Sequence, residues 1–315
     1  MSSPAVVTVI VPGFDVGPWA AEALDSLRAQ TRAQWRALLV DDASRDDTAD
    51  VFARAAAADD RFEVVTHPER RGLSAARNTG LDRVRTPFVG FLDADDRLRP
   101  RALERLVGTL ERTGSDFAVG AYVRLRPDGA GGYAAGGVQP WVAAATDPER
   151  SGTTLWEHPA ASGNIVAWSK VSRTDFWVRT ALRFPEGRLY EDQVVAQRMY
   201  TRARAFDVIP DVVVDWRERA DGSSITQHRE QLPVLREYLD ALRGGLDVLG
   251  AAGASAAVRA RVRLILAMDL PPLVGIAGAH ADAQYRRALG SFVRDLHDLD
   301  PSAPTPSEVA AAALW

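Results

Sequence analysis

The stretch PFVGFLDADDRL, residues 87–98, runs from a short apolar segment straight into a cluster of carboxylates. The β-branched and aromatic side chains of 88–92 are typical of a buried strand. Carboxylates this close together repel one another and cost free energy unless a cation or hydrogen-bond donors lie between them. Asp93 and Asp95 can therefore bind a hard divalent cation, whose other ligands would be water and phosphate oxygens.

The same acids also suit a simpler structure. A helix is predicted over residues 100–113, and acidic side chains just before a helix are favoured by its dipole. Taken alone, the pattern Asp93-Ala94-Asp95 fits a capped turn as well as it fits a cation site, so the neighbouring segments must decide.

Strands and helices alternate at short intervals along the N-terminal third of the chain. Apolar runs predict strands at residues 6–11, 37–40, 62–67 and 88–92. Apolar residues at helical spacing predict helices at about 18–29, 48–52 and 72–84. Such alternation is typical of βαβ units, in which a mostly parallel sheet has helices on both faces. We therefore predict an α/β, Rossmann-like fold.

Polar or turn-forming residues follow three of these strands. Pro12-Gly13, Asp41-Asp42 and Asp93-Asp95 each come directly after an apolar run. Ligands of such sheets bind beyond the carboxyl ends of the strands. We therefore expect these residues to meet at one crevice, although they lie far apart in the sequence.

A glycine-rich segment follows the next predicted strand, which covers residues 117–125. Residues 126–137 are expected to form a turn and a flexible loop. Within them GAGGYA, residues 129–134, matches the dinucleotide-binding pattern G-x-G-x-x-A. No helix pattern follows it, and it does not follow the first strand, so a plain glycine loop is the favoured interpretation.

The pattern changes again near residue 226, where leucines begin to recur at helical spacing. Helices are predicted at about 232–249, 255–270 and 282–297. We therefore divide the chain into a first domain at residues 1–227 and a helical C-terminal module at 228–315, whose role the sequence does not indicate.

The composition limits the class of protein. The 315 residues carry a net charge of −4, which argues against nucleic-acid binding, and no cysteine, which excludes disulfides, Cys-ligated zinc and thiol catalysis. The N-terminus has no basic leader, and no apolar run approaches the ~18–20 residues of a membrane span. We expect a cytoplasmic protein, with peripheral contact to the inner face of the membrane and homo-oligomer formation left open.

Several stretches together resemble successive blocks of the family 2 glycosyltransferases, which have the GT-A fold. The first half shows VTVIVPGFDVGPWAAEALDSLRAQT at 7–31, LLVDDASRDDT at 38–48, RRGLSAARNTGL at 70–81 and FVGFLDADD at 88–96. The second half shows AWSKVSRTDFW at 167–177, LRFPEGRLYEDQVVAQRMY at 182–200 and DWRERADGSSIT at 215–226. The resemblance covers about residues 5–227. It is closest to the enzymes that build or decorate bacterial cell-wall and capsular polymers.

The resemblance implies an activity. A hexosyl or N-acetylhexosaminyl group would pass, with inversion and with the help of Mn²⁺ or Mg²⁺, from a nucleotide-diphosphate sugar to an acceptor hydroxyl. The donor is expected to be a UDP-sugar, and the acceptor a glycan, a cell-wall polymer or a small molecule. Residues of about 1–97 would bind the nucleotide sugar, and about 98–227 the acceptor.

The resemblance also implies a site for the nucleobase. The rigid turn at Pro12 and the aromatic face of Phe14 would hold a uracil ring by stacking. Asp42 would accept a hydrogen bond from the uracil N–H, although the same residue also suits a helix cap. The family usually has Tyr-Asn where this chain has Phe14-Asp15. That change keeps the stacking and loses the hydrogen bond of the phenol.

Further residues would bind the phosphates. Gly72 would let the backbone approach the ligand closely, and Arg77 would reach the base or the phosphates with its fork of donors. Arg217, Arg219 and Ser224 resemble the family's flexible segment that clamps the diphosphate. The alternatives are a solvated helix face for Arg77 and a plain charged turn for the segment around Arg217.

The remaining roles concern the reaction itself. The resemblance assigns Asp93 to the ribose and the metal, and Asp95 to the metal. It makes Asp192 the general base, which takes the proton from the acceptor hydroxyl. Glu191 would raise the pKa of Asp192 by repulsion or bind sugar hydroxyls. Two acids before QVVAQRMY also suit a helix N-terminus, and both interpretations can hold together.

Trp168 and Lys170, in AWSK, are the candidates for contact with the donor sugar or the acceptor. Aromatic faces pack well on sugar rings. Core packing is the competing interpretation, because it accounts for most tryptophan residues in proteins.

Two other functions are weighed. A nucleotidyltransferase on a related fold would need basic residues directly after the first strand, and PGFDVGPW has no Lys or Arg. A non-catalytic protein that binds only nucleotide or polymer is disfavoured by the acids at Asp93, Asp95, Glu191 and Asp192, and a turnover assay would decide.

Overall fold

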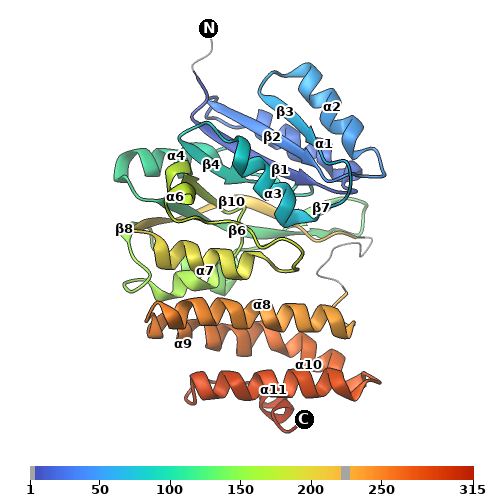
Figure 1. The fold of residues 1–315 in the computed structure, drawn as a ribbon, viewed down its shortest axis with the longest axis vertical. Coiled ribbons are helices and arrows are strands. Elements are labelled where there is room, and N and C mark those ends of the chain that lie inside the picture. Colours follow the sequence, from blue (N-terminus) through green and yellow to red (C-terminus); the bar gives the residue numbers. More distant parts are fainter. Residues whose placement is uncertain (1–3, 221–227) are drawn as a thin grey trace. The chain divides into compact units, whose positions relative to one another are not determined.

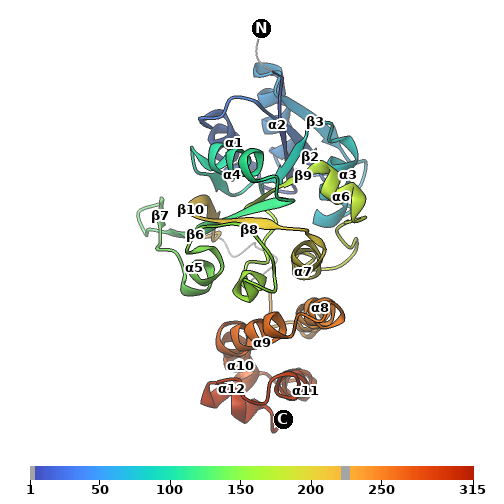
Figure 2. The ribbon, with the colours of Figure 1, turned by 90° about the vertical axis from the view of Figure 1, so that its left-hand side faces the viewer.

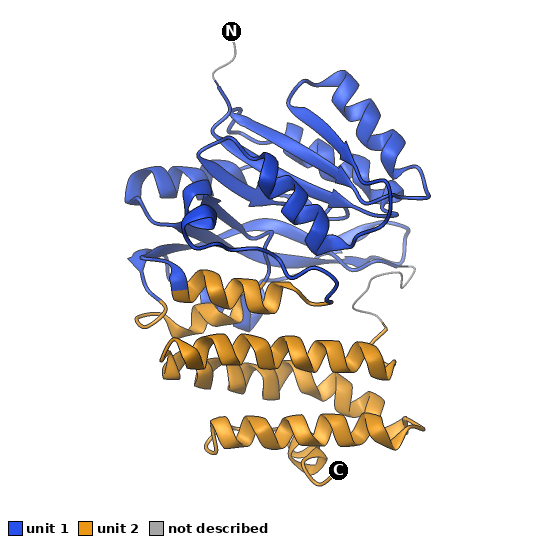
Figure 3. Ribbon diagram, in the orientation of Figure 1, with its two compact units in different colours: residues 1–154, 166–188, 202–220 blue, residues 155–165, 189–201, 221–315 orange. Residues whose placement is uncertain are grey.

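The computed structural model describes residues 4–220 and 228–315, and the chain forms two compact units (Figure 3). Unit 1 comprises residues 1–154, 166–188 and 202–220, and unit 2 comprises 155–165, 189–201 and 221–315. The functional boundary at residue 227 stays a prediction. The compact units divide the chain differently, because two earlier segments join the C-terminal helices.

Unit 1 is built on one mixed sheet (Figure 1). Its strand order is β3-β2-β1-β4-β9-β6-β10-β5, with β7 beside β6 and β8 beside β10. The bounds are β1 Val7–Gly13, β2 Trp35–Asp41, β3 Phe62–Thr66, β4 Phe88–Phe91, β5 Arg97–Leu98, β6 Phe117–Pro127, β7 Tyr133–Ala135, β8 Arg150–Thr153, β9 Lys170–Arg173 and β10 Phe206–Arg217. The first four strands in this order are parallel, as the alternation of strands and helices predicts, whereas β9 runs antiparallel to both of its neighbours.

Helices cover both faces of this sheet. They are α1 Gly17–Arg28, α2 Thr48–Ala58, α3 Leu73–Arg83, α4 Ala102–Thr113, α5 Pro140–Thr146 and α6 Thr174–Arg179. Figure 2 shows α1 and α4 on one side of the sheet and α3 and α6 on the other. The packing of α3 on β1 is so close that a Cβ atom at Gly80 would lie 2.5 Å from Ile10 Cγ2. The predicted α/β class is confirmed.

The central strands are buried on both faces, which accounts for their continuous apolar sequences. Every residue of β1 is buried, and β2 is buried except at the half-buried Arg36. In the ladder, Gly13 lies beside Asp41 and Ile10 lies beside Phe91. The carboxyl ends of β1, β2 and β4 are therefore neighbours, and this positions the residues that follow them.

The glycine-rich segment at 126–137 differs from the predicted loop. Tyr133–Ala135 forms β7, which pairs antiparallel with the end of β6. The Asp128 carboxylate closes the turn by accepting from the amides of Ala130 and Gly132, both at 2.9 Å. Because this carboxylate satisfies the turn, the segment is a hairpin with no helix directly behind it. The glycines thus serve the turn, in line with the interpretation against a dinucleotide loop.

Unit 2 is helical. It contains η1 Pro159–Gly163, α7 Asp192–Arg202, α8 Leu232–Ala251, α9 Ser255–Leu264, the π-helical turn η3 Ile265–Asp269, α10 Leu270–Ala279, α11 Ala283–Leu299 and α12 Ser307–Ala312. The three predicted helices are present as α8, as α9 with its continuation, and as α11. Most of the leucines that predicted α8 are buried, namely Leu235, Leu239, Leu242, Leu246 and Leu249.

The continuous helical stretch Ser255–Ala279 differs from the expectation on membrane spans. An 18-residue window within it has a mean hydropathy of 1.5, and among the described residues this stretch is long and apolar enough to cross a membrane by length and composition. The sequence shows no unbroken apolar run there because Arg263 and Asp269 interrupt it. The core helix of a soluble protein meets the same criterion, so the criterion alone does not assign this helix to a membrane.

Candidate active site

The ends of β1, β2 and β4 bring several predicted residues together in unit 1. The amide of Asp42 donates to the carbonyl of Gly13 at 2.9 Å, and the amide of Leu92 donates to that of Ile10 at 3.0 Å. Pro12 is buried where β1 ends. The three strand ends are therefore neighbours, and the crevice at which their residues would meet stays a prediction.

Asp42 organises the loop that leads into α3. Its buried carboxylate accepts from the amides of Arg71 at 2.9 Å and Gly72 at 2.7 Å, and it lies 2.6 Å from Nδ1 of His67. The other ring nitrogen of His67 lies 2.9 Å from Oγ1 of Thr79 in α3. Gly72 has a φ of +91°, which an L side chain would rarely adopt. These contacts position the backbone beside the strand ends, and the uracil contact of Asp42 stays a prediction.

Phe14, the predicted stacking partner of the base, has a cation on its ring. The guanidinium of Arg70 lies 4.0 Å from the ring centroid. Phe14 is half-buried and Arg70 is exposed. The arginine therefore lies over the ring that is predicted to stack on a nucleobase. Sequence analysis missed Arg70 as well as His67, because Phe14 and Asp42, with which they interact, lie in other segments far away in the sequence.

Arg77 is buried rather than on a solvated helix face. Its side chain is 1% exposed, and Nη2 donates to Oδ1 of Asp93 at 2.8 Å. The guanidinium also lies 5.1 Å from the ring of Phe184. Arg77 is buried against the acidic turn, residues 93–96, and this burial excludes the alternative of a solvated position. Its predicted contact with a nucleotide stays a prediction.

The side chain of Asp95 is bound by Arg219, another of the predicted site residues. Nε of Arg219 donates to Oδ2 of Asp95 at 2.8 Å, and its guanidinium lies 4.6 Å from the ring of Trp19. Burial raises the pKa of Asp95, and the charge of Arg219 opposes that rise. Arg219 thus contacts a predicted metal ligand, whereas Ser224 lies outside the described residues.

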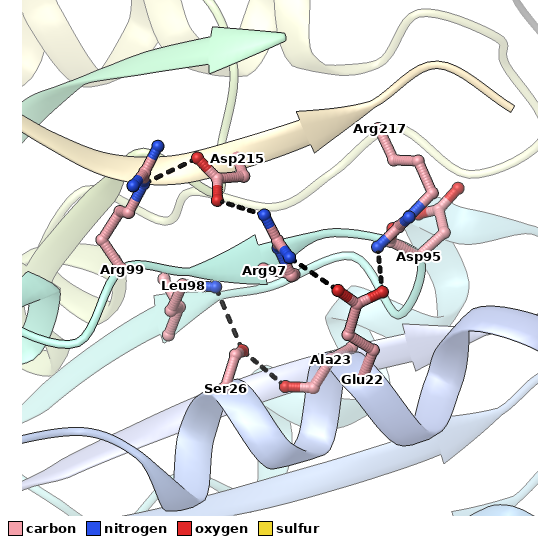
Figure 4. A network of polar contacts seen from close by, with 9 residues as sticks. All are labelled: Glu22, Ala23, Ser26, Asp95, Arg97, Leu98, Arg99, Asp215 and Arg217. Carbon is pink, nitrogen blue, oxygen red and sulfur yellow. Dashed lines mark hydrogen bonds and ion pairs between the residues drawn. The ribbon is translucent and has the colours of Figure 1, made fainter. Parts of the chain in front are cut away.

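Arg217 is hydrogen-bonded to the acidic turn in unit 1. Its backbone amide donates to Oδ1 of Asp96 at 2.7 Å, and its Nε donates to the carbonyl of Asp95 at 2.7 Å. The guanidinium also pairs with Glu22 of α1 (Figure 4). Burial, together with repulsion from Asp95, raises the pKa of Asp96 well above its ordinary value. Arg217 therefore fastens this turn to β10 and α1, and its predicted diphosphate contact stays a prediction.

A chain of alternating charges continues from Glu22 along β5. Arg97 donates to Glu22 at 2.7 Å and to Asp215 at 2.8 Å, and Arg99 donates to the other oxygen of Asp215 at 2.7 Å (Figure 4). Asp215 is only 4% exposed, so it is a buried acid with an arginine on each oxygen. This network ties α1, β5 and β10 together next to Asp95.

The acidic turn suits a divalent cation by the chemistry of its donors. Asp93 and Asp95 supply carboxylate oxygens, which hard cations prefer, and a diphosphate would supply more. Among the residues that the structure describes, no group of three His, Asp or Glu side chains is gathered tightly enough to bind a metal by itself. The pair therefore fits a site completed by the substrate, with Asp93 and Asp95 as the protein ligands.

Glu191 and Asp192 belong to unit 2. Asp192, which begins α7, is half-buried, and Glu191, which precedes it, is buried. Acids at this place interact favourably with the helix dipole, so the alternative interpretation as a helix N-terminus is correct. It is compatible with the role of Asp192 as general base, which stays a prediction.

Trp168 and Lys170 are buried in unit 1. The ring of Trp168 packs edge-on against Tyr122 at 4.8 Å and stacks with Trp216 at 6.4 Å. Nζ of Lys170 donates to the carbonyl of Val166 at 2.6 Å. These contacts favour the competing interpretation of core packing for the tryptophan, and the contact of either residue with a sugar stays a prediction.

Comparison with known proteins identifies sequences that share the N-terminal blocks. The chain is 30% identical over 124 residues to the putative teichuronic acid biosynthesis glycosyltransferase TuaG of Bacillus subtilis. The matched segment covers 39% of this chain and 49% of TuaG. In each of the first three relatives, the matched segment spans about a third to a half of that protein's length.

Solved structures share the fold over nearly the whole chain. Residues 1–349 of Staphylococcus aureus TarS, in complex with UDP-GlcNAc, superpose with a TM-score of 0.74 at 19% identity, covering 97% of this chain and 83% of that one. The mannosyltransferase PcManGT of Pyrobaculum calidifontis, in complex with GDP-Man and Mn²⁺, gives 0.54 at 18% identity, covering 99% and 87%. The GT-A-like fold with C-terminal helices is therefore confirmed. The model of glycosyl transferase family 2 matches residues 8–169, just over half of the sequence, and the chain belongs to that family.

Proposed function

We propose that this nucleotide-sugar glycosyltransferase is an inverting enzyme that depends on Mn²⁺ or Mg²⁺. It transfers a hexosyl or N-acetylhexosaminyl group from a UDP-sugar to a hydroxyl of a bacterial cell-surface polymer or glycan. The acidic turn that follows β4 carries this proposal. Asp93 is held there by the buried Arg77 and Asp95 by the half-buried Arg219, next to the ends of β1 and β2.

The chemistry needs one base. Asp192 takes the proton of the acceptor hydroxyl while that oxygen attacks the anomeric carbon from the face opposite the diphosphate, and the bond from carbon to the diphosphate oxygen breaks. A cation held by Asp93 and Asp95 would neutralise charge on the departing diphosphate. One carboxylate is therefore enough, whereas an inverting glycoside hydrolase needs two.

Similar proteins support the choice of donor class without deciding the base. TarS is solved with UDP-GlcNAc and PcManGT with GDP-Man. The Arg70–Phe14 contact lies where the base is proposed to stack. UDP is proposed here because of the resemblance of the N-terminal blocks, and GDP is the competing base.

The first experiment is titration calorimetry of UDP into the purified chain with Mn²⁺ and then with EDTA. CDP, GDP and dTDP are titrated beside it. UDP should bind at least about tenfold more tightly than the other three, and EDTA should weaken it, because the cation joins the acidic turn to the diphosphate. Failure of all four nucleotides with Mn²⁺ present would contradict the proposed activity. Tighter binding of GDP would change the donor.

Asp95→Ala tests the metal site. The substitution should abolish the gain in UDP affinity that Mn²⁺ provides, because one of two protein ligands is lost. Asp60→Ala is the matched control, since Asp60 is exposed and precedes β3 at the opposite edge of the sheet. The same titrations with and without Mn²⁺ measure the effect, and an unchanged dependence on Mn²⁺ would remove the metal role of Asp95.

A further inference from the structure

The residue before the two acids of unit 2 has an unusual backbone conformation. Tyr190 has a φ of +57°, in the left-handed region that few residues other than glycine adopt. It is followed by Glu191 and then by Asp192, which is the first residue of α7. Such a conformation costs free energy and persists only where the surroundings hold it. The contacts of Tyr190 therefore bear on how α7 begins.

An aromatic and cationic cluster, formed by Tyr238 of α8 and by Arg229 just before that helix, holds Tyr190. Its ring centroid lies 4.6 Å from that of Tyr238 in α8. The guanidinium of Arg229 lies 4.6 Å from the ring of Tyr238 and 5.9 Å from that of Tyr190. Tyr238 is buried. The ring of Tyr190 is thus held by residues that lie almost forty to fifty positions later in the chain.

The position of Tyr238 is itself determined by an acid. Its hydroxyl donates to Oδ1 of Asp269 at 2.9 Å, and Nη2 of Arg261 donates to Oδ2 of Asp269 at 3.2 Å. Asp269 ends the π-helical turn η3, a form that is often found at functional sites. The same Nη2 donates to Oε1 of Gln193 at 3.1 Å. Gln193 follows Asp192, so the network reaches both neighbours of the acidic pair.

Two glycines bring α8 close to the same turn of α7. A Cβ atom at Gly244 would lie 3.1 Å from Cγ2 of Val194, and one at Gly245 would lie 3.4 Å from the carbonyl oxygen of Gln193. The start of α7 is therefore held at Tyr190, at Gln193 and at Val194, on both sides of Asp192.

We propose that Tyr238 and Arg261 are positioning residues for the reaction. Through Tyr190 and Gln193, they hold the backbone at the start of α7 and so set the direction of the Asp192 carboxylate. This inference rests on the proposed role of Asp192 as general base. It gives the C-terminal helices a function, which is to shape the segment that carries the base.

The test compares two variants with one control. Tyr238→Leu removes the ring that packs on Tyr190, and Arg261→Met removes the donor to Gln193. Arg243→Met is the control, because Arg243 also lies in α8 but pairs with Asp240 and with Asp295 of α11. With a UDP-sugar donor, both variants should lower kcat by about tenfold or more while KM for the donor and Kd for UDP stay within about twofold. The control should change none of these.

Hydrogen exchange provides a readout that needs no substrate. The amides of residues 190–194 should exchange faster in Tyr238→Leu and Arg261→Met, and at the parent rate in Arg243→Met. Tyr190→Gly is the second variant, because glycine accepts the positive φ while the ring contact is lost. It should lower kcat without lowering the melting temperature as far as Tyr238→Leu does.

The outcomes separate the two claims. Unchanged exchange at 190–194 would overturn the inference at any level of activity, and so would an equal loss of UDP binding and of kcat. If Asp192→Asn abolishes transfer but Tyr238→Leu and Arg261→Met keep the parent kcat, only the inference falls. If the parent chain binds no nucleotide and transfers no sugar, the proposed function falls, and the positioning role falls with it.

Discussion

At the scale of single residues, two arginines of one sequence block differ in what they do. Arg77 is 1% exposed and pairs with Asp93, whereas Arg71 and its partner Glu186 are 45% and 46% exposed. The sequence singles out Asp93 because a carboxylate follows an apolar strand. It does not show that Arg77 is buried, since its partner lies on another element and α3 has no clear apolar stripe.

Arg77→Met should lower the free energy of unfolding by about 2–3 kcal/mol, because it leaves the partly buried Asp93 carboxylate without its cation. Arg71→Met is the matched control and should cost less than about 1 kcal/mol, as expected for an exposed pair. Urea unfolding followed by circular dichroism measures both. Equal costs for the two variants would contradict the assigned difference in burial.

At the scale of elements, the sequence predicts the strands that consist of a continuous run of apolar side chains. β1, β2 and β4 are continuous apolar runs that end at acids or at Pro-Gly. β7 was missed because its hairpin depends on the Asp128 carboxylate within a glycine-rich segment. β9, at Lys170–Arg173, has a polar sequence and is a strand only because β4 and β6 flank it.

The start of β6 gives a prediction of pH dependence. Burial acts to raise the pKa of Asp116, but hydrogen bonds from Arg204 and Arg179 outweigh it and hold the pKa below its ordinary value of 3.8. The charged carboxylate therefore stabilises the fold fully above about pH 4 and loses this effect as the pH falls further. The stability advantage of the parent chain over Asp116→Asn should shrink below about pH 4, as measured by urea unfolding at several pH values. An advantage that grows on acidification would contradict the assigned direction.

At the scale of the whole molecule, the compact units do not follow the order of the chain. Unit 2 takes two segments from the region that resembles the transferase family, 155–165 and 189–201, and joins them to α8–α12. Leucine spacing predicted those C-terminal helices. It could not indicate that α7 packs with them, because the contact rests on Gly244, Gly245 and the Arg261–Gln193 hydrogen bond rather than on a sequence motif.

Truncation after residue 227 should therefore disturb more than the C-terminal helices. In a fragment of residues 1–227, the segment 189–201 loses its partners in α8 and α9. We expect it to be cleaved by trypsin at Arg198 or Arg202 far faster than in the full chain. Limited proteolysis with mass spectrometry measures this. A fragment in which that segment resists cleavage as well as it does in the parent chain would show that the C-terminal helices are a separate module.

The close approach of Gly80 to Ile10 has a consequence for chimeric enzymes assembled from relatives. A donor segment that carries α3 with any side chain at position 80 would collide with the isoleucine of β1. A chimera that keeps Ile10 of this chain should therefore tolerate a crossover point between residues 10 and 80 only when the other parent also has a glycine at position 80.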